Sequence, residues 1–117
     1  MNDDPIVSAY LEHTRHLVHN VIHGDDPYDS ALHVMGATLD FFPAYEHAGD
    51  VYCLWGALTD WVEVKPHEKA LAVGHMVTAA REWLALDHDD DDAVRGYLVS
   101  WHDLVGYDGN VSGGGSN

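Results

Sequence analysis

Four histidines are spaced along one short stretch, EHTRHLVHNVIHG, at residues 12–24. The pairs Glu12/His16 and His19/His23 are four residues apart and His16/His19 three apart, so in a helix these side chains share one face. Imidazole and carboxylate groups at these spacings can hold Zn²⁺ or Ni²⁺. Glu12, His16, His19 and His23 are therefore candidate ligands of a weak surface metal site. The alternative is the solvent-facing side of an ordinary helix, without a cofactor, because structural zinc needs four ligands and no thiolate lies nearby.

Motifs that would carry catalysis are incomplete or absent. His67-Glu68-Lys69-Ala70-Leu71 begins like the zinc-protease motif HExxH, but Leu71 occupies the position of the second histidine. Cys53 has no neighbouring base in the sequence and is interpreted as a packing thiol. The chain also lacks the GxSxG, CxxC and glycine-rich phosphate-binding patterns. These observations favour a non-enzymatic protein.

The charge of the chain is its most unusual property. Twenty acidic residues face five basic ones, which gives a formal net charge of −15. Residues 1–58 carry nine acids and one base, and residues 59–117 carry eleven acids and four bases, so the charge is spread over the whole chain. Direct binding to nucleic acids or to anionic membranes is excluded, because both require clustered Lys and Arg. The acidity indicates either adaptation to salt or genome composition, or a surface that docks on a basic partner protein.

Length and cysteine content suggest a simple organisation. A chain of 117 residues is long enough for one hydrophobic core. A single cysteine, Cys53, allows no internal disulfide and fits a reducing compartment. No apolar run approaches the roughly 20 residues that span a bilayer, and no secretory leader is recognisable. We therefore expect a cytoplasmic protein.

The hydrophobic periodicity is helical throughout. It predicts helices over residues 5–23, 27–42, 66–86 and 90–106, and a helix within residues 43–64 that begins either at Pro43 or near Asp50. The predicted fold is all-α: a compact single-domain bundle of four or five antiparallel helices over residues 1–108. Residues 109–117 are rich in Gly and Ser and are expected to form a flexible tail.

The apolar faces of these helices indicate the core and a candidate binding surface. Trp55, Trp61, Trp83 and Trp101 are each expected to face the core, as is Ile6. The second helix has an apolar arc too wide for one interface, since Val34 and Phe41 flank the row of Leu32, Met35, Leu39 and Phe42. It is therefore either central or part of a binding surface.

These features together predict a non-enzymatic interaction protein, such as an inhibitor or a nucleic-acid mimic of the accessory type that phages encode. Its partner would be a protein, and a basic one fits the charge best; a homodimer is a further possibility. Two alternatives stay open: a metal-binding protein that uses the histidine stripe, and a small-molecule binder or enzyme with an aromatic pocket between helices. The expected partner-binding residues are four apolar or aromatic anchors and four rim carboxylates: Val34, Phe41, Tyr45 and Tyr52, with Asp89, Asp90, Asp91 and Asp92.

Overall fold

The computed structural model describes residues 5–41 and 45–105. Within these residues, five α-helices follow one another, with one short 3₁₀ turn between the third and the fourth. Their bounds are α1 Pro5–His23, α2 Pro27–Leu39, α3 Ala48–Val64, η1 Pro66–Glu68, α4 Lys69–Ala85 and α5 Asp91–Val105. No strand occurs among the described residues. The predicted all-α bundle is confirmed.

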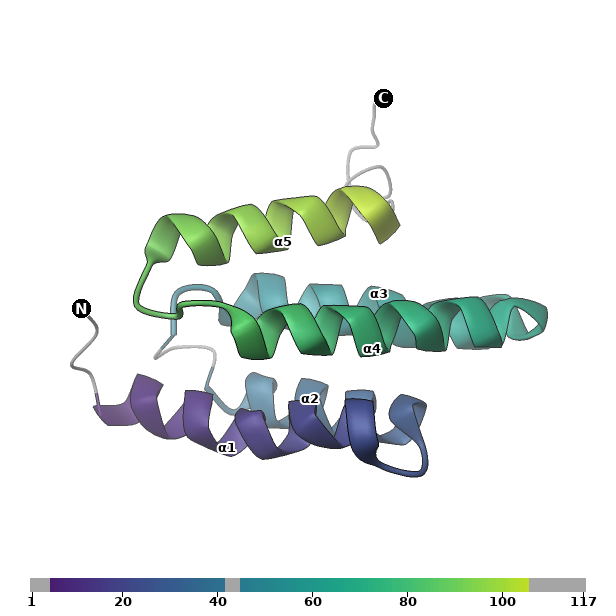
Figure 1. Ribbon diagram of the computed structural model, residues 1–117, viewed down its shortest axis with the longest axis horizontal. Helices are drawn as coiled ribbons and strands as arrows, with labels where there is room; N and C mark the ends of the chain where they lie inside the picture. The colour runs from purple at the N-terminus through teal and green to yellow at the C-terminus, as the bar shows by residue number, and fades with distance from the viewer. Residues whose placement is uncertain (1–4, 42–44, 106–117) are drawn as a thin grey trace.

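The helices form three layers (Figure 1). Helices α1 to α4 alternate in direction, and each packs against its neighbours in the order α1, α2, α3, α4 and back to α1. Helix α5 lies on the other side of α3 and α4 from α1 and α2. Both α3 and α5 begin at the end of the molecule where the α4–α5 connection lies. This arrangement brings the starts of two helices together.

Local chemistry explains where the helices begin. Asp26 caps α2, since its Oδ1 accepts a hydrogen bond from the backbone N–H of Asp29 at 3.2 Å, and Pro27 occupies the first turn, where no intrahelical N–H bond is lost. Asp90 acts in the same way before α5 and accepts from the N–H of Ala93 at 3.2 Å. Each of these cap side chains satisfies one backbone N–H that the helix itself leaves unpaired.

Three expected boundaries differ from the structure. Helix α2 ends at Leu39 instead of residue 42. Helix α3 begins at Ala48, later than the Pro43 alternative and two residues before the Asp50 alternative. The predicted helix 66–86 is divided into η1 and α4, because the turn that follows Pro66 is closed by a bond from the N–H of Lys69 to the carbonyl of Pro66, three residues apart.

The core is built from buried side chains of all five helices. The largest of those that are almost completely buried are Trp55, Tyr10, Leu54, Leu58 and Met76. Between α1 and α2, the hydroxyl of Tyr10 lies 3.0 Å from Oγ1 of Thr38. Because the Thr38 hydroxyl donates to the Val34 carbonyl at 2.7 Å, it accepts from Tyr10, and both buried hydroxyls are satisfied.

The buried face of α2 is narrower than the apolar arc of its sequence. Ala31, Val34 and Thr38 are buried, whereas Leu32 and Leu39 of the predicted row are exposed. Small side chains on the inner face let α2 lie close to both α1 and α3, and this spacing leaves the larger leucines outside. Among the other core expectations, Trp55, Trp83 and Trp101 are buried, Trp61 is only partly buried, and Ile6 is 53% exposed.

Within the described residues, no helix has both the length and the apolar character needed to span a bilayer.

Candidate functional site

The histidine stripe of α1 points away from the core. His13, His16, His19 and His23 are all exposed, as is Glu12, and the rings of His19 and His23 lie with their centroids 4.4 Å apart. The stripe is therefore on the surface, as its spacing predicts. Among the described residues, however, three ligand atoms within 4.8 Å of one another are found elsewhere, in Glu46, His47 and Asp91. The stripe residues do not converge in this way, and their metal binding stays a prediction.

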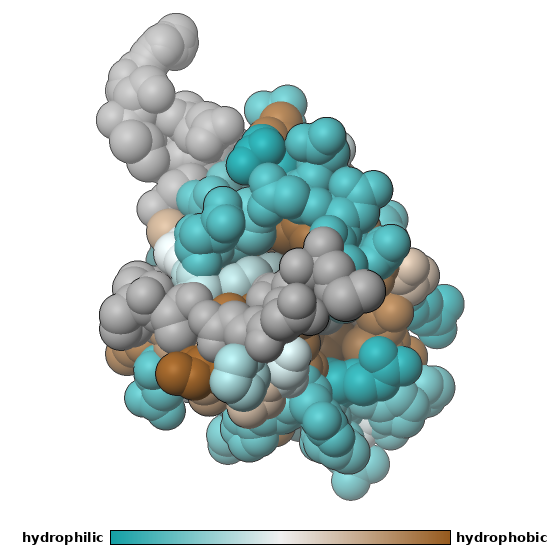
Figure 2. Space-filling model, turned by 90° about the vertical axis from the view of Figure 1, so that its left-hand side faces the viewer, coloured by the Kyte–Doolittle hydropathy of each residue, from teal (hydrophilic) through white to brown (hydrophobic). Residues whose placement is uncertain are grey.

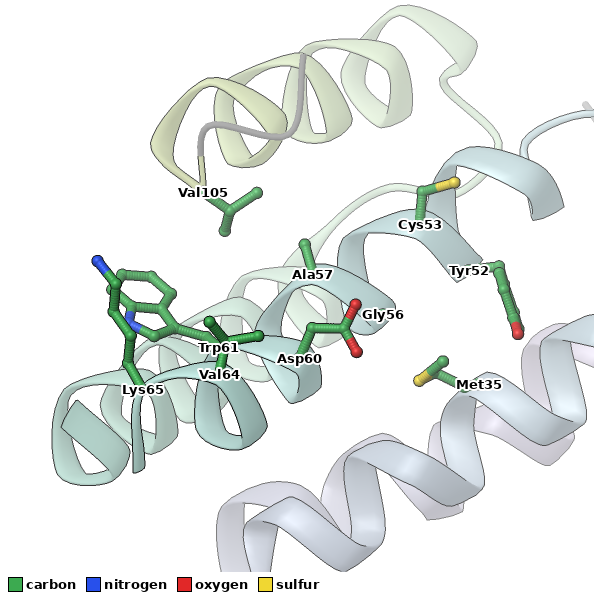
Figure 3. Close-up of a pocket in the computed structure, with 10 residues that line it drawn as sticks. All are labelled: Met35, Tyr52, Cys53, Gly56, Ala57, Asp60, Trp61, Val64, Lys65 and Val105. Atoms are coloured by element: carbon green, nitrogen blue, oxygen red, sulfur yellow. The ribbon is translucent and has the colours of Figure 1, made fainter. Parts of the chain in front are cut away.

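A groove with a volume of about 670 Å³ runs along α3. It is bounded by α2 on one side and by the end of α5 on the other (Figure 3). The residues that line it are Met35, Tyr52, Cys53, Gly56, Ala57, Asp60, Trp61, Val64, Lys65 and Val105. Most of these side chains are apolar or aromatic, and Asp60 and Lys65 bring one charge of each sign. Such a mixture suits a binding surface with an apolar floor and a few polar contacts.

The groove is hollow because α3 presents small residues at its centre. Gly56 and Ala57 stand between the larger side chains of Tyr52 and Trp61 (Figure 3). A Cβ atom at Gly56 would come within 3.5 Å of the terminal methyl of Met35, which is ordinary van der Waals contact. The sulfur of Met35 lies 3.3 Å from the hydroxyl oxygen of Thr59, whose proton is also within reach of the Trp55 carbonyl at 2.9 Å. The depth of the groove thus depends on the missing side chain at position 56.

Hydrogen bonds hold one end of the groove in shape. The indole N–H of Trp61 donates to Oε1 of Glu68 at 2.7 Å, and this bond is the main reason why the pKa of Glu68 is lowered. On the α2 side, the hydroxyl of Tyr28 donates to Oε2 of Glu63 at 2.8 Å, which raises the pKa of Tyr28, and the nearby charge of Asp60 raises it further. Carboxylates therefore surround this end of the groove.

The expected partner-binding residues divide into accessible and buried ones. Tyr52 lines the groove, and Asp89, Asp90, Asp91 and Asp92 are exposed. Phe41 is half-buried and packs against the Tyr10 ring at a centroid distance of 5.2 Å. Two expectations are wrong: Val34 is 1% exposed and Tyr45 is 5% exposed, so neither can anchor a partner. Val34 faces the neighbouring helices across the inner side of α2, and Tyr45 packs its ring on Tyr10 at 5.2 Å.

A second region with polar chemistry lies where α3 and α5 begin. We call it the acidic end and define it by Glu46, Asp50, Asp87, Asp89, Asp90, Asp91 and Asp92 together with His47, His88 and Arg95. The imidazole of His47 donates from Nε2 to Oδ1 of Asp91 at 2.6 Å, and Oε2 of Glu46 lies 3.9 Å from the same nitrogen. Arg95 holds the other oxygen of Asp91 at 2.7 Å. Viewed from this end, the molecule shows mainly hydrophilic surface with small, separate apolar areas (Figure 2).

Burial and charge shift several pKa values at the acidic end. The hydrogen bond from His47 lowers the pKa of the Asp91 carboxyl, and Arg95 adds to the effect. Burial raises the pKa of the Tyr45 hydroxyl, and the charges of Asp91 and Glu46 raise it further. Burial lowers the pKa of His88, whose Nε2 has no hydrogen-bond partner among the described residues.

Sequence patterns gave no reason to single out His47. It stands 44 residues from Asp91 in the chain, and it precedes a helix whose start the periodicity left open. The one available signal was the capping logic that places Asp91 at the start of α5, where carboxylates oppose the positive end of the helix dipole. Its partner, His47, is determined by the tertiary structure, which places the starts of α3 and α5 side by side.

Comparisons with models of known protein families, with curated proteins and with solved structures found no match to this chain. The groove and the acidic end are therefore the basis on which a function can be assigned.

Proposed function

We propose that this protein is a non-enzymatic, acidic interaction module that binds a basic, amphipathic segment of a partner protein in the groove along α3. The observation that carries this proposal is the groove itself, a hollow of about 670 Å³ that is lined by both apolar and polar side chains, on a chain with a formal net charge of −15. A helix that lays its apolar face into such a groove is a recurring mode of peptide recognition. The apolar contacts supply affinity and the charge supplies steering.

The dimensions of the groove suit a short helix. The lining residues of α3 extend from Tyr52 to Lys65, which corresponds to about 20 Å at ~1.5 Å per residue. Trp61 and Met35 provide the kind of aromatic and flexible side chains that are enriched where proteins bind one another. Val64, which is 75% exposed, adds an apolar side chain that water covers in the unbound protein. Covering these side chains would release water and favour association.

The charges around the groove favour a basic partner. Asp60 lines the groove directly, and Glu63 lies beside it on the same helix. The acidic end adjoins the groove near Tyr52, where α3 begins. Lys65 lies at the opposite end of the groove, where the carboxylates of Glu63 and Glu68 are also present. A partner segment would therefore meet mainly negative charge along its whole length.

Synthetic peptides test the proposal directly. Three peptides of about 14 residues, which span about 20 Å as helices, would be titrated into the ¹⁵N-labelled protein: a basic amphipathic sequence, an acidic sequence with the same apolar residues, and a basic sequence with its apolar residues scrambled. We expect amide shifts in the groove residues with the first peptide alone, and an affinity that falls as salt is raised. Equal binding of all three, or shifts confined to other faces, would contradict the proposal.

Matched variants distinguish binding in the groove from non-specific binding to exposed apolar side chains. Val64→Ser removes an exposed apolar side chain in the groove, and Leu71→Ser removes one of 51% exposure on α4, which does not line it. Val64→Ser should lower the affinity for the basic amphipathic peptide about tenfold, the equivalent of ~1.4 kcal/mol. Leu71→Ser should leave the affinity unchanged. The same pair of variants, used as baits with native lysate, would show whether a captured protein occupies the groove.

A small apolar ligand is the second candidate occupant of the groove. Its volume of about 670 Å³ falls within the range of about 300–1,000 Å³ that is usual for ligand sites. A ligand of this kind would be neutral or apolar, and its binding would be insensitive to salt. A second copy of this chain would instead reveal itself as a concentration-dependent dimer that Val64→Ser dissociates.

A further inference from the structure

Three potential ligand atoms converge where α3 and α5 begin. Nε2 of His47, a carboxylate oxygen of Glu46 and a carboxylate oxygen of Asp91 all lie within 4.8 Å of one another. His47 is buried, whereas Glu46 and Asp91 are exposed. The imidazole is therefore fixed in position, and both carboxylates can adjust around it from the solvent side.

The donor set fits a divalent transition metal such as Zn²⁺. One imidazole nitrogen and two carboxylate oxygens are ligands that zinc accepts at about 2.0–2.2 Å, with a water molecule in the fourth position. In a tetrahedral site these bond lengths place ligand atoms about 3.3 Å apart. Without the ion, Nε2 of His47 and Oδ1 of Asp91 are only 2.6 Å apart. Asp91, whose side chain is 50% exposed, can turn outward by this amount. The ion would take the place of the proton that now bridges the pair.

A buried hydroxyl next to this cluster points to the same ligand. Tyr45 is 5% exposed, and its hydroxyl has no hydrogen-bond partner among the described residues. The ring of Tyr45 meets that of His47 edge-on at a centroid distance of 5.5 Å, and the charges of Asp91 and Glu46 reach its hydroxyl. Buried polar groups without a partner are rare in folded proteins. A metal-bound water would give this hydroxyl a partner, and the ion would offset the two negative charges that face it.

Some of the surrounding charges favour a bound cation, and one opposes it. Asp87, Asp89, Asp90 and Asp92 precede or follow Asp91 and favour a cation. Arg95 opposes it, because its Nη2 lies 2.7 Å from the second oxygen of Asp91 and its Nη1 lies 3.5 Å from Asp92. The site should therefore bind more tightly when the charge at position 95 is removed.

The structure assigns to Glu46, His47 and Asp91 a binding site for a divalent transition metal ion of the Zn²⁺ class, which links the start of α3 to the start of α5. This site is separate from the histidine stripe on α1, which has its own capacity for metals, and it does not depend on the groove or on a protein partner.

The experiment uses a variant in which the histidine stripe of α1 has lost its candidate histidine ligands. In a His16→Gln/His19→Gln/His23→Gln background, ZnCl₂ would be titrated by calorimetry, and Co²⁺ would be added to record the ligand-field absorption that reports tetrahedral coordination. We expect one ion per chain. Adding His47→Gln or Asp91→Asn should weaken binding at least tenfold, whereas Arg95→Gln should strengthen it several-fold. His33→Gln is the matched control, because His33 is also paired with an aspartate, Asp29 at 3.5 Å, but has no third ligand atom in reach.

Each outcome decides the proposal. Stoichiometric binding that disappears with both His47→Gln and Asp91→Asn, and persists with His33→Gln, supports it. Asp91→Asn alters an exposed side chain and leaves the fold intact, so it remains informative if His47→Gln fails to fold. No stoichiometric binding in the background protein, or binding that the position 47 and 91 variants leave unchanged, would overturn the proposal. Binding seen only when the stripe is present would assign the metal to α1 instead.

Discussion

The groove and the acidic end lie along the same helix, α3, but they are built by opposite means. The groove exists because side chains are missing: Gly56 and Ala57 leave space between Tyr52 and Trp61. The acidic end exists because polar side chains converge, with His47 held between carboxylates from two parts of the chain. One region offers apolar surface and shape, and the other offers charge and hydrogen bonds.

In the proposed function, this difference assigns affinity to the groove and steering to the acidic end. Carboxylates concentrated where α3 and α5 begin produce a field that reaches about 10 Å at ordinary ionic strength and raises the rate of encounter with a cation or a basic protein. The groove acts only at contact, where burial of apolar area contributes most of the affinity. A change in one region should therefore alter a different observable from a change in the other.

The largest effect is expected at the buried polar pair of the acidic end. His47→Leu should lower the free energy of unfolding by about 1–2 kcal/mol in metal-free buffer, because it removes a hydrogen bond to a charged carboxylate. The loss stays small because Asp91 is half exposed and water screens part of the attraction. Urea unfolding measures the change. His33→Leu, which breaks a pair that is 63% exposed on both sides, should cost almost nothing; equal losses in the two variants would mean that the burial of His47 is unimportant.

The second prediction concerns pH. Burial lowers the pKa of His88, so the unfolded chain takes up a proton at a higher pH than the folded chain does. The stability that neutral His88 contributes is thus fully present above the ordinary pKa of 6.5 and is lost as the pH falls through the lowered value. The slope is at most about 1.4 kcal/mol per pH unit, because one group exchanges at most one proton.

His88→Phe isolates this contribution, because phenylalanine retains a ring that can pack on Trp83, where the ring centroids are now 4.4 Å apart. The difference in urea stability between the native protein and the variant, followed from pH 7.5 to pH 5, should change in favour of the variant as the pH falls. The other histidines are present in both proteins, so their contributions cancel. A constant difference across this range would contradict the expected neutral state of His88.

The smallest effect is expected in the groove. Gly56→Ala should raise the free energy of unfolding by about 1 kcal/mol, since glycine within a helix costs ~0.8–1.0 kcal/mol relative to alanine and the added Cβ fits against Met35. Gly74→Ala on α4, where the added Cβ meets no atom within 4 Å, should stabilise to a similar extent. Thermal unfolding compares the two. Only Gly56→Ala narrows the groove, so only this variant should also lower the affinity for the basic amphipathic peptide.

The helical periodicity predicted most of the fold and little of the site. The bounds of the first helix, Pro5–His23, agree with the prediction, because proline suits the first turn of a helix and Gly24 follows its last residue. Helix α2 was predicted, but which part of its wide apolar arc is buried was left open: Ala31, Val34 and Thr38 are inside, and Leu32 and Leu39 are exposed. Hydropathy ranks leucine above threonine, whereas the close approach of three helices selects small side chains.

The predicted partner-binding residues also show that local spacing does not determine which side chains are buried. Tyr52 and Asp89–Asp92 lie at accessible positions, but Tyr45 is buried, since its ring completes a stack with Tyr10 that only the folded chain creates. His47 was missed because its hydrogen-bond partner, Asp91, lies 44 residues away in the chain. Contacts between residues far apart in the chain depend on the angle and register at which helices pack, and periodicity carries no information about either.

The amino-acid sequence by itself determined that the chain is helical, that it carries a large negative charge and that the histidines of α1 face the solvent. These properties follow from local spacing and composition, which act within one or two turns of a helix. Only the tertiary structure decided that small residues of α3 would leave a groove between α2 and α5, and that His47 would meet Asp91 across 44 residues of chain. Both outcomes depend on which helices lie side by side and in which register, and that choice is made by packing of the whole core.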